Sequence, residues 1–368
     1  MNNAAVTTRI SRRKLLLAGA SGAIAATGFV GAPAFSQQRK LKYTLPWLAA
    51  GSSVWVFVAK HHGFLAKQGI DIDISRGFGS VAAAQAIAAG QFDIGTVVAP
   101  PLVMSIAQGM PLYSIGAVEQ DSVMGVCVPA DSPIRKPSDL VGKKVGAVPT
   151  SAEFPFFPAY CKKAGIDMSK IEIVQLDNKV LERAMIDKQV DAIMGIAGSS
   201  VPVLLSKGEK VRFMTYRSVG VATYGSLVTV TKKAYAADSG MYDATVTGLM
   251  EALKFSLLDP EAAKEIFYKA VPEIALSPTG KESTNLGLGL QQVAILAGDA
   301  QKRPLGWADT SVFGGMSDMV MEYISKPGMT KPAADDIFTN KAIGKVSLST
   351  DEWATASANN KQYLSILG

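Results

Sequence analysis

The sequence predicts an α/β protein built from two lobes, and three observations support this prediction. Short strand-like segments alternate with helix-like segments up to about residue 242. Two stretches far apart in the chain share one plan, which suggests two similar lobes. The chain has 368 residues, which is more than one hydrophobic core comfortably serves. Strands that alternate with helices indicate parallel strands joined by helical crossovers, so we expect each lobe to be a sheet flanked by helices.

The first 36 residues have the features of an export signal. Ser11-Arg12-Arg13-Lys14 precedes a short apolar run rich in Gly and Ala, and small residues offer cleavage sites after Ala34 or Ser36. The paired arginines favour the twin-arginine route. The apolar run is too short and too rich in glycine to form a membrane span of about 20 residues. We therefore expect export to the periplasm, and no lipid anchor because no cysteine lies near the cleavage site.

Removal of this signal changes the charge balance. The signal contains Arg9, Arg12, Arg13 and Lys14 and no acidic residue, so 33 of the 37 Lys and Arg remain against 31 Asp and Glu. The mature chain is therefore near +2, which gives no reason to expect a nucleic-acid partner. No segment of it resembles a transmembrane helix, so we expect a soluble protein.

The expected elements follow from hydrophobic periodicity and turn residues. The predicted strands are residues 42–46, 70–74, 92–95, 112–118, 125–129, 144–147, 172–175, 191–194, 211–214 and 226–230. The predicted helices between them are residues 53–67, 80–89, 101–108, 151–163, 179–188 and 199–207. The pattern then becomes helical, at residues 244–258, 261–270, 283–297 and 311–325.

An internal echo helps to place the lobes. Residues 86–109 and 184–208 each contain a helix end, a Gln-apolar-Asp step, a short strand, a small-residue loop and a helix with proline. We expect the chain to cross between lobes near residues 118–124 and 219–227. The predicted domains are a signal at 1–36, lobe 1 at 37–121 plus 217–368 with its helical C-terminal segment, and lobe 2 at 122–216. A fold of two α/β lobes binds its ligand between them, at the carboxyl ends of the strands.

Loops at the predicted strand ends supply the candidate ligand contacts. Serines at or just before helix starts could bind a carboxylate, a sulfonate or a similar oxyanion through free N–H groups and the helix dipole. Ordinary N-capping needs the same residues and stays open as the alternative. The serines in question are Ser53, Ser80, Ser151 and Ser199.

Other side chains in these loops suit an organic solute. Trp47 could form a wall for a flat ligand, with core packing as its alternative, and Phe154 is a second aromatic candidate. Tyr224 could supply a hydroxyl group. Glu153 could accept a hydrogen bond from a ring N–H or an amine, with a role as a first-turn helix acid as its alternative. The candidate ligand-binding residues are Trp47, Gly51, Ser52, Ser53, Gly79, Ser80, Thr96, Val97, Thr150, Ser151, Glu153, Phe154, Gly198, Ser199 and Tyr224.

The charges near these loops bear on the solute. Arg76 and Arg217 are the nearest bases, and we expect both to be solvated at the surface. Glu153 is the one acid, and an unpaired carboxylate facing a bound oxyanion would cost affinity. A small inorganic anion such as nitrate is therefore disfavoured.

Histidine and cysteine usage argues against catalysis. His61 and His62 are the only histidines, they point in different directions on a helix, and no third ligand lies nearby, so we expect no metal site. The mature chain has no other histidine, which removes most acid–base and nucleophile schemes, so we expect neither enzyme activity nor a cofactor. Cys127 and Cys161 are the only cysteines. We expect two buried thiols, with a disulfide as the open alternative.

An ordered set of motifs resembles the periplasmic substrate-binding proteins of ABC importers. The resemblance is to the superfamily that binds nitrate, sulfonate, taurine and thiamine-pyrimidine precursors. It implies a two-lobe periplasmic binding protein fold of type II, hinged closure on a small-molecule solute, and delivery to an ABC permease and its ATPase by a monomer. The motifs that carry it are GFLAKQGIDIDI (63–74), AAAQAIAAGQFDIG (82–95), DSPIRKPSDLVGKKVG (131–146), DKQVDAI (187–193) and RPLGWAD (303–309).

Two other functions stay open beside this one. Eukaryotic relatives of the pyrimidine-precursor branch are synthases, although this sequence lacks their cysteine-rich motif. A periplasmic sensor would have the same fold and would present its ligand to a receptor. The solute itself is left open among pyrimidine-like, aromatic, and sulfonate- or carboxylate-bearing compounds.

Overall fold

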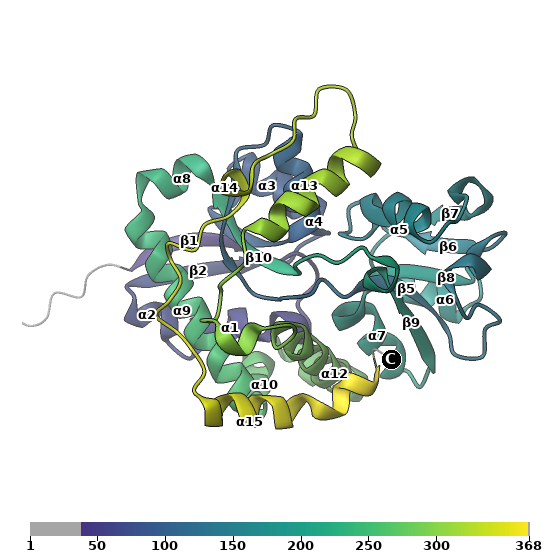
Figure 1. Cartoon of the computed structure of the whole chain (residues 1–368). Coiled ribbons are helices and arrows are strands. Elements are labelled where there is room, and N and C mark those ends of the chain that lie inside the picture. Colours follow the sequence, from purple (N-terminus) through teal and green to yellow (C-terminus); the bar gives the residue numbers. More distant parts are fainter. Residues whose placement is uncertain (1–37, 367–368) are drawn as a thin grey trace, which may run out of the picture. The chain divides into compact units, whose positions relative to one another are not determined.

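Two five-stranded sheets with helices packed around them form the framework of the described residues, 38–366, in this computed structural model (Figure 1). The export signal predicted for residues 1–36 lies outside the described residues. Among the described residues, no helix is both long enough and apolar enough to cross a bilayer.

The first sheet has the strand order β2-β1-β3-β10-β4. Strand β1 pairs in parallel with β2 and β3, whereas β10 is antiparallel to both β3 and β4. The strands are β1 (Arg39–Thr44), β2 (Ile70–Ser75), β3 (Ile94–Val98), β4 (Leu112–Ala117) and β10 (Ser226–Thr231). We refer to this sheet and the helices on it as lobe 1.

The second sheet has the order β7-β6-β8-β5-β9, and we refer to it and its helices as lobe 2. Strand β6 is parallel to β7 and β8, and β5 is antiparallel to β8 and β9. The strands are β5 (Met124–Pro129), β6 (Lys144–Ala147), β7 (Glu172–Gln175), β8 (Ala192–Ile196) and β9 (Val211–Thr215).

The α/β prediction is confirmed, but the expectation of parallel strands fails for β5 and β10, which pair antiparallel with their neighbours. Strands β5 and β10 are the first strands after each passage of the chain between the sheets. Neither follows a crossover helix from a neighbouring strand in its own sheet, so nothing forces a parallel pairing. The strands of the first sheet all come from the segments predicted for lobe 1, and those of the second sheet from the segment predicted for lobe 2. The exact residues at which each lobe begins and ends stay a prediction.

The internal echo corresponds to a repeated contact. Asp93 Oδ2 accepts a hydrogen bond from the Lys42 backbone N–H at 2.8 Å, just before β3. Asp191 Oδ2 accepts one from the Lys144 backbone N–H at the same distance, just before β8. Each Asp therefore ties the start of its strand to a neighbouring parallel strand.

The helices around lobe 1 differ from the prediction at one break and in four additional helices, at residues 232–237, 272–275, 334–337 and 350–360. The helix predicted at 53–67 is interrupted because Gly63 has a φ of 85°, in the left-handed region that favours glycine. The elements are η1 (Gly51–Ser53), α1 (Val54–His61), α2 (Phe64–Lys67), α3 (Ser80–Ala88), α4 (Ala99–Ala107), α8 (Lys232–Ala237), α9 (Ser239–Leu258), α10 (Pro260–Ala270), α11 (Pro272–Ala275), α12 (Pro278–Ile295), η6 (Ala300–Lys302), α13 (Ser311–Tyr323), α14 (Ala334–Ile337), α15 (Thr350–Asn360) and η7 (Lys361–Ile366).

The helices of lobe 2 are shorter. The helix predicted at 151–163 is a 3₁₀ turn followed by a helix. Pro155 and Pro158 each lie in the first turn of their element, where the missing N–H breaks no intrahelical hydrogen bond. The elements are η2 (Pro137–Leu140), η3 (Phe154–Phe156), α5 (Phe157–Lys163), η4 (Met168–Lys170), α6 (Leu181–Ile186), α7 (Ala197–Leu205) and η5 (Tyr216–Val219).

Helix α12 connects the C-terminal segment to lobe 2. Its Leu290 and Ala294 are buried in one apolar cluster with Val201 and Leu204 of α7. Tyr363 of η7 belongs to the same cluster, so the end of the chain holds α12 in place.

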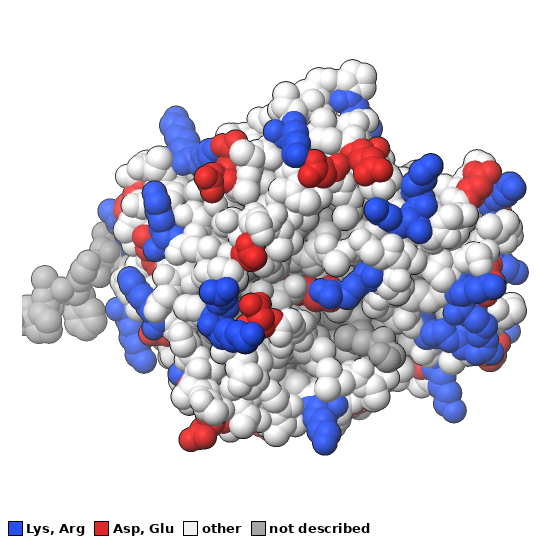
Figure 2. Space-filling view, viewed as in Figure 1, with Lys and Arg blue, Asp and Glu red and all other residues white. Residues whose placement is uncertain are grey.

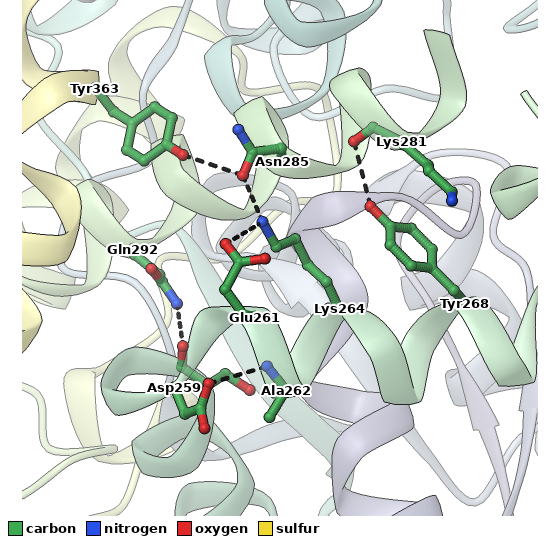
Figure 3. A network of polar contacts seen from close by, with 10 residues as sticks. Asp259, Glu261, Ala262, Lys264, Tyr268, Lys281, Asn285, Gln292 and Tyr363 are labelled. Carbon is green, nitrogen blue, oxygen red and sulfur yellow. Dashed lines mark hydrogen bonds and ion pairs between the residues drawn. The ribbon is translucent and has the colours of Figure 1, made fainter. Parts of the chain in front are cut away.

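A polar network secures the other side of α12 (Figure 3). The buried Lys264 of α10 donates to Glu261 Oε1 and to Asn285 Oδ1, both at 2.7 Å. The Tyr363 hydroxyl donates to the same Asn285 oxygen at 3.3 Å. Asn285 therefore joins α10, α12 and η7.

The two cysteines are free and buried, as we expected from the sequence. Burial raises the pKa of Cys127 and raises the pKa of Cys161 to about 12. Cys127 lies in β5 and Cys161 in α5.

Candidate ligand cleft

A cavity lies where the carboxyl ends of parallel strands from both sheets face each other. Its walls are formed by the segment after β1, the end of β3, the segment between β4 and β5, the loop after β6 and the end of β8. Helix α12 closes it from the C-terminal part of the chain. The lining consists of Leu45, Pro46, Trp47, Leu48, Ser52, Ser53, Trp55, Val56, Ser80, Thr96, Val98, Glu119, Val123, Ser151, Ala152, Glu153, Leu181, Gly195, Ile196, Gly198, Ser199, Ser200, Ser226 and Gln291.

The structure brings most of the candidate residues together. Those in the lining are Trp47, Ser52, Ser53, Ser80, Thr96, Ser151, Glu153, Gly198 and Ser199. They come from both lobes and from segments more than 100 residues apart in the sequence.

Six candidates lie outside the lining, and three of these pack elsewhere in the fold. Val97 is buried on the opposite face of β3 from Thr96 and Val98, because side chains alternate along a strand. Gly51 lies against α12, where an added Cβ would come within 2.3 Å of the Thr284 carbonyl oxygen. Phe154 packs at the edge of the apolar cluster that contains α5.

Tyr224 also has a structural role. Its hydroxyl accepts a hydrogen bond from the Asp309 backbone N–H at 2.9 Å, and its ring lies 5.4 Å from that of Phe313 between centroids. The remaining two candidates, Gly79 and Thr150, contact each other across the lobes.

The sequence did not single out several polar residues of the lining. Glu119 directly follows a predicted strand, so an acid at a strand end was a signal that could have found it. Gln291 lies in the middle of a helix far along the chain, and no local pattern marks it. Ser226, at the start of β10, is another polar residue of the lining that was not predicted, whereas Ser200 ends the predicted loop that supplied the candidates Gly198 and Ser199.

Glu119 is held as a buried acceptor. Its Oε1 accepts a hydrogen bond from Gln291 Nε2 at 3.0 Å, and its Oε2 accepts one from the Ser226 backbone N–H at 3.1 Å. Burial raises the pKa of Glu119, and these two hydrogen bonds oppose part of that effect. A buried carboxyl group is stabilised by hydrogen-bond donors or a positive charge beside it, so Glu119 favours a solute that presents such a group.

Glu153 is the second buried carboxyl group of the lining, on the side of lobe 2. It precedes η3, and only 3% of its surface is exposed. Burial raises the pKa of Glu153. The two alternatives that the sequence left open for Glu153 are therefore compatible, because the residue lies at a helix start and also lines the cavity.

Gln291 has an unused acceptor. Its Nε2 donates to Glu119 and also to the Ser52 carbonyl oxygen, but its Oε1 is buried with no hydrogen-bond partner among the described residues. The buried Ser151 hydroxyl lies beside Glu153, where its interaction with the carboxyl group opposes part of the rise in the pKa of Glu153. An unpaired buried polar group costs about 1–3 kcal/mol, so Gln291 Oε1 favours a polar partner in the cavity.

The other serines largely serve the fold. Ser53 Oγ donates to the Ala50 carbonyl oxygen at 2.9 Å, and Ser199 Oγ donates to that of Ile196 at 3.1 Å. Ser80 Oγ accepts from the Val98 backbone N–H at 3.2 Å. The four serines do share one cavity, but these three hydroxyl groups already have local partners.

Among the described residues that line the cavity, there is no Lys, Arg or His. Of the two nearby bases, Arg217 is half exposed, as expected, and pairs with Asp121 at 2.6 Å. The expectation of a solvated side chain is wrong for Arg76. It stacks on the ring of Phe78, 4.4 Å from its centroid, and its Nε and Nη2 are buried with no hydrogen-bond partner among the described residues. An oxyanion beside two buried carboxyl groups would lack a compensating charge.

No group of three or more His, Cys, Asp or Glu within residues 38–366 is arranged to hold a metal ion. His62 stacks on Phe255, with the ring centroids 4.5 Å apart. Basic and acidic side chains are interspersed over most of the face in Figure 2, without a continuous basic groove.

The sequence and the fold of this chain both resemble those of known proteins. The family model described as NMT1/THI5 like matches residues 52–263, more than half of the chain. A Haemophilus influenzae protein named for thiamine biosynthesis is 25% identical over 248 residues, which cover 67% of this chain and 78% of that protein. The formylaminopyrimidine-binding protein of Halalkalibacterium halodurans is 24% identical over 246 residues, which cover 63% of this chain and 74% of that protein.

Among solved structures, the alkanesulfonate-binding protein of Xanthomonas axonopodis pathovar citri has a similar fold. The TM-score is 0.62 at 18% identity, and the match covers 82% of this chain and 99% of that protein. This likeness confirms the predicted two-lobe binding-protein fold. The named relatives of known function are solute-binding proteins and not enzymes, in agreement with the prediction from histidine usage.

Proposed function

Because the chain belongs to the NMT1/THI5-like family, we propose that it is the solute-binding component of an ABC importer. In this proposal the twin-arginine signal at residues 1–36 exports the chain to the periplasm. The mature monomer captures a small organic solute between its lobes and delivers it to a permease driven by an ATPase. The fold and a cavity at facing strand ends support this role.

The composition of the cavity supports a particular class of solute. Its lining contains the buried carboxyl groups of Glu119 and Glu153, the unpaired Oε1 of Gln291, and no basic residue among those described. This is the observation that carries the proposal, because such a set offers hydrogen-bond acceptors and no positive charge that could pair with an anion. We propose a solute that presents N–H donors or a positive charge, such as an aminopyrimidine or an amidine.

The apolar part of the lining suits a flat body. Trp47, Trp55 and Leu45 lie on the lobe 1 side, and Leu181 and Ile196 lie on the lobe 2 side. Aromatic and aliphatic walls bury a ring while a few polar groups fix its orientation. In this arrangement Glu119 and Gln291 would accept from an amino group, and Glu153 would face the ring from the opposite lobe.

The proposed class of solute is narrower than the set of solutes that the sequence left open. Pyrimidine-like and aromatic amino compounds remain, whereas alkanesulfonates, carboxylates and nitrate are disfavoured because they would face two carboxyl groups. The α7 start at Gly198 and Ser199 can still donate backbone N–H groups to a neutral carbonyl or hydroxyl of the solute.

A thermal-shift panel tests the proposal. A ligand that binds only the folded state stabilises it by about 2.7 kcal/mol at a hundred times its Kd, which raises the melting temperature by several degrees. We expect this rise with 4-amino-2-methylpyrimidine and related amino compounds, and none with nitrate or methanesulfonate. A rise with the anions alone would contradict the proposed class, and turnover of a bound compound would contradict the binding role.

A further inference from the structure

Thr150 contacts the opposite lobe through both its hydroxyl group and its backbone carbonyl group. It follows β6 in lobe 2, and its Oγ1 donates to the Phe78 carbonyl oxygen of lobe 1 at 2.5 Å. Its own carbonyl oxygen accepts from the Val81 backbone N–H at 3.1 Å. Because Thr150 lies outside the cavity lining, these contacts join the lobes without touching a solute.

Gly79 makes this close contact possible. Its φ is 115°, which L side chains rarely adopt, and an added Cβ would lie 2.0 Å from the Thr150 carbonyl oxygen. The loop that carries it is fixed to lobe 1, since Gly77 N donates to the Trp47 carbonyl oxygen at 2.8 Å and Gly79 N to that of Pro46 at 3.0 Å. Only glycine at position 79 lets Thr150 reach this loop.

The contact is coupled to the cavity through chain neighbours. Ser80 directly follows Gly79, and Ser151 directly follows Thr150, and both serines line the cavity. When the two lobes meet at Thr150, the polar groups of both loops are brought to the same space.

We propose that Thr150 and Gly79 form a latch that stabilises the closed arrangement of the lobes. They are positioning residues, because they set the solute affinity through the population of the closed form. The proposal rests on the proposed function only in that the lobes open and close. Removing one neutral hydrogen bond of the latch lowers the affinity about 2- to 12-fold, mainly through faster release.

Closure can be measured without any solute. Spin labels on cysteines introduced at the exposed Gln91 in lobe 1 and Lys210 in lobe 2 report the distance between the lobes. The native thiols are buried and react poorly by comparison. The protein is refolded from denaturant beforehand, so that no solute remains bound.

Four variants separate the latch from general effects. We expect T150V to lower the short-distance population and T150S, which keeps the hydroxyl group, to restore it. We expect G79A to lower the short-distance population further, because the added Cβ would collide with the Thr150 carbonyl oxygen. G90A is the matched control, because Gly90 also has a positive φ, 73°, but an added Cβ there has nothing within 4 Å. An unchanged distance distribution in both T150V and G79A, with folding checked by circular dichroism, overturns the latch.

A second measurement separates the latch from the identity of the solute. Stopped-flow release of 4-amino-2-methylpyrimidine should be about 2- to 12-fold faster in T150V than in the unaltered protein and unchanged in T150S. If that probe does not bind at all, the proposed solute class is contradicted, whereas the latch still stands or falls on the label distances. Equal release rates in T150V and the unaltered protein overturn the latch.

Discussion

Gln291 Nε2 donates to Glu119 Oε1 at 3.0 Å and thereby joins α12 to the segment between β4 and β5. The same nitrogen donates to the Ser52 carbonyl oxygen in η1. One side chain therefore connects three elements around the cavity and fixes a buried carboxyl group as an acceptor. The opposite end of this amide, Oε1, has no partner among the described residues and is suited to a donor on the solute.

Replacing Glu119 with Gln should weaken binding of an amino-bearing solute about 10-fold to 100-fold. The change keeps the shape but replaces one acceptor oxygen with an NH₂ donor, and leaving a buried polar group without its partner costs about 1–3 kcal/mol. Isothermal titration calorimetry with 4-amino-2-methylpyrimidine measures the effect. E172Q is the control, because the side chain of Glu172 is 61% exposed on β7. Equal affinity of E119Q and the unaltered protein would exclude Glu119 from recognition.

Replacing Trp47 with Ala should weaken binding without unfolding the protein. Trp47 lines the cavity and is only partly buried, so its loss removes a wall of the site more than it removes core packing. Affinity is measured by isothermal titration calorimetry, which does not depend on tryptophan fluorescence, and the melting temperature serves as the control for folding. Unchanged affinity would remove Trp47 from the site.

The buried carboxyl group of Glu153 should make stability depend on pH. Burial raises its pKa in the folded state, so between the unfolded value of about 4.3 and the raised folded value the folded protein holds more protons than the unfolded one. This group therefore makes stability fall as pH rises through that window. The contribution is full below the window and lost above it.

E153Q isolates this effect from the other titrating groups. The difference in melting temperature between E153Q and the unaltered protein should grow in favour of E153Q from pH 4 upward and level off above the folded pKa. Parallel curves from pH 4 to 8 would show that Glu153 does not titrate abnormally.

Replacing Tyr363 with Ala should destabilise the fold by about 3–5 kcal/mol, as expected for a buried aromatic side chain. The ring lies over Gly289, where an added Cβ would come within 2.2 Å of it. Urea unfolding measures the change. Y363F is the matched control and should lose no more than about 1.5 kcal/mol, since it gives up one hydrogen bond. A loss below 1 kcal/mol in Y363A would mean that η7 does not hold α12.

The sequence allowed the architecture to be predicted where the signal was local. The repeated Gln-apolar-Asp step identified Asp93 and Asp191, which make equivalent contacts before β3 and β8. Strand ends also marked Trp47, Ser80 and Glu153, because a parallel sheet exposes its ligand contacts there.

The rest depended on tertiary structure. The antiparallel direction of β10 follows from the path of the chain between sheets, which no short window of sequence records. Gln291 reaches the cavity only because α12 packs between η1 and α7. Thr150 was assigned to the ligand from its position in a loop, but its partner, Phe78, lies 72 residues away.

A crystal structure of the protein with the best solute of the panel tests the central claim most directly. We predict an N–H donor of the solute within hydrogen-bond distance of both Glu119 and Gln291 Oε1, with the ring between Trp47 and the loop of Glu153. A sulfonate, carboxylate or nitrate group in that position would contradict the account.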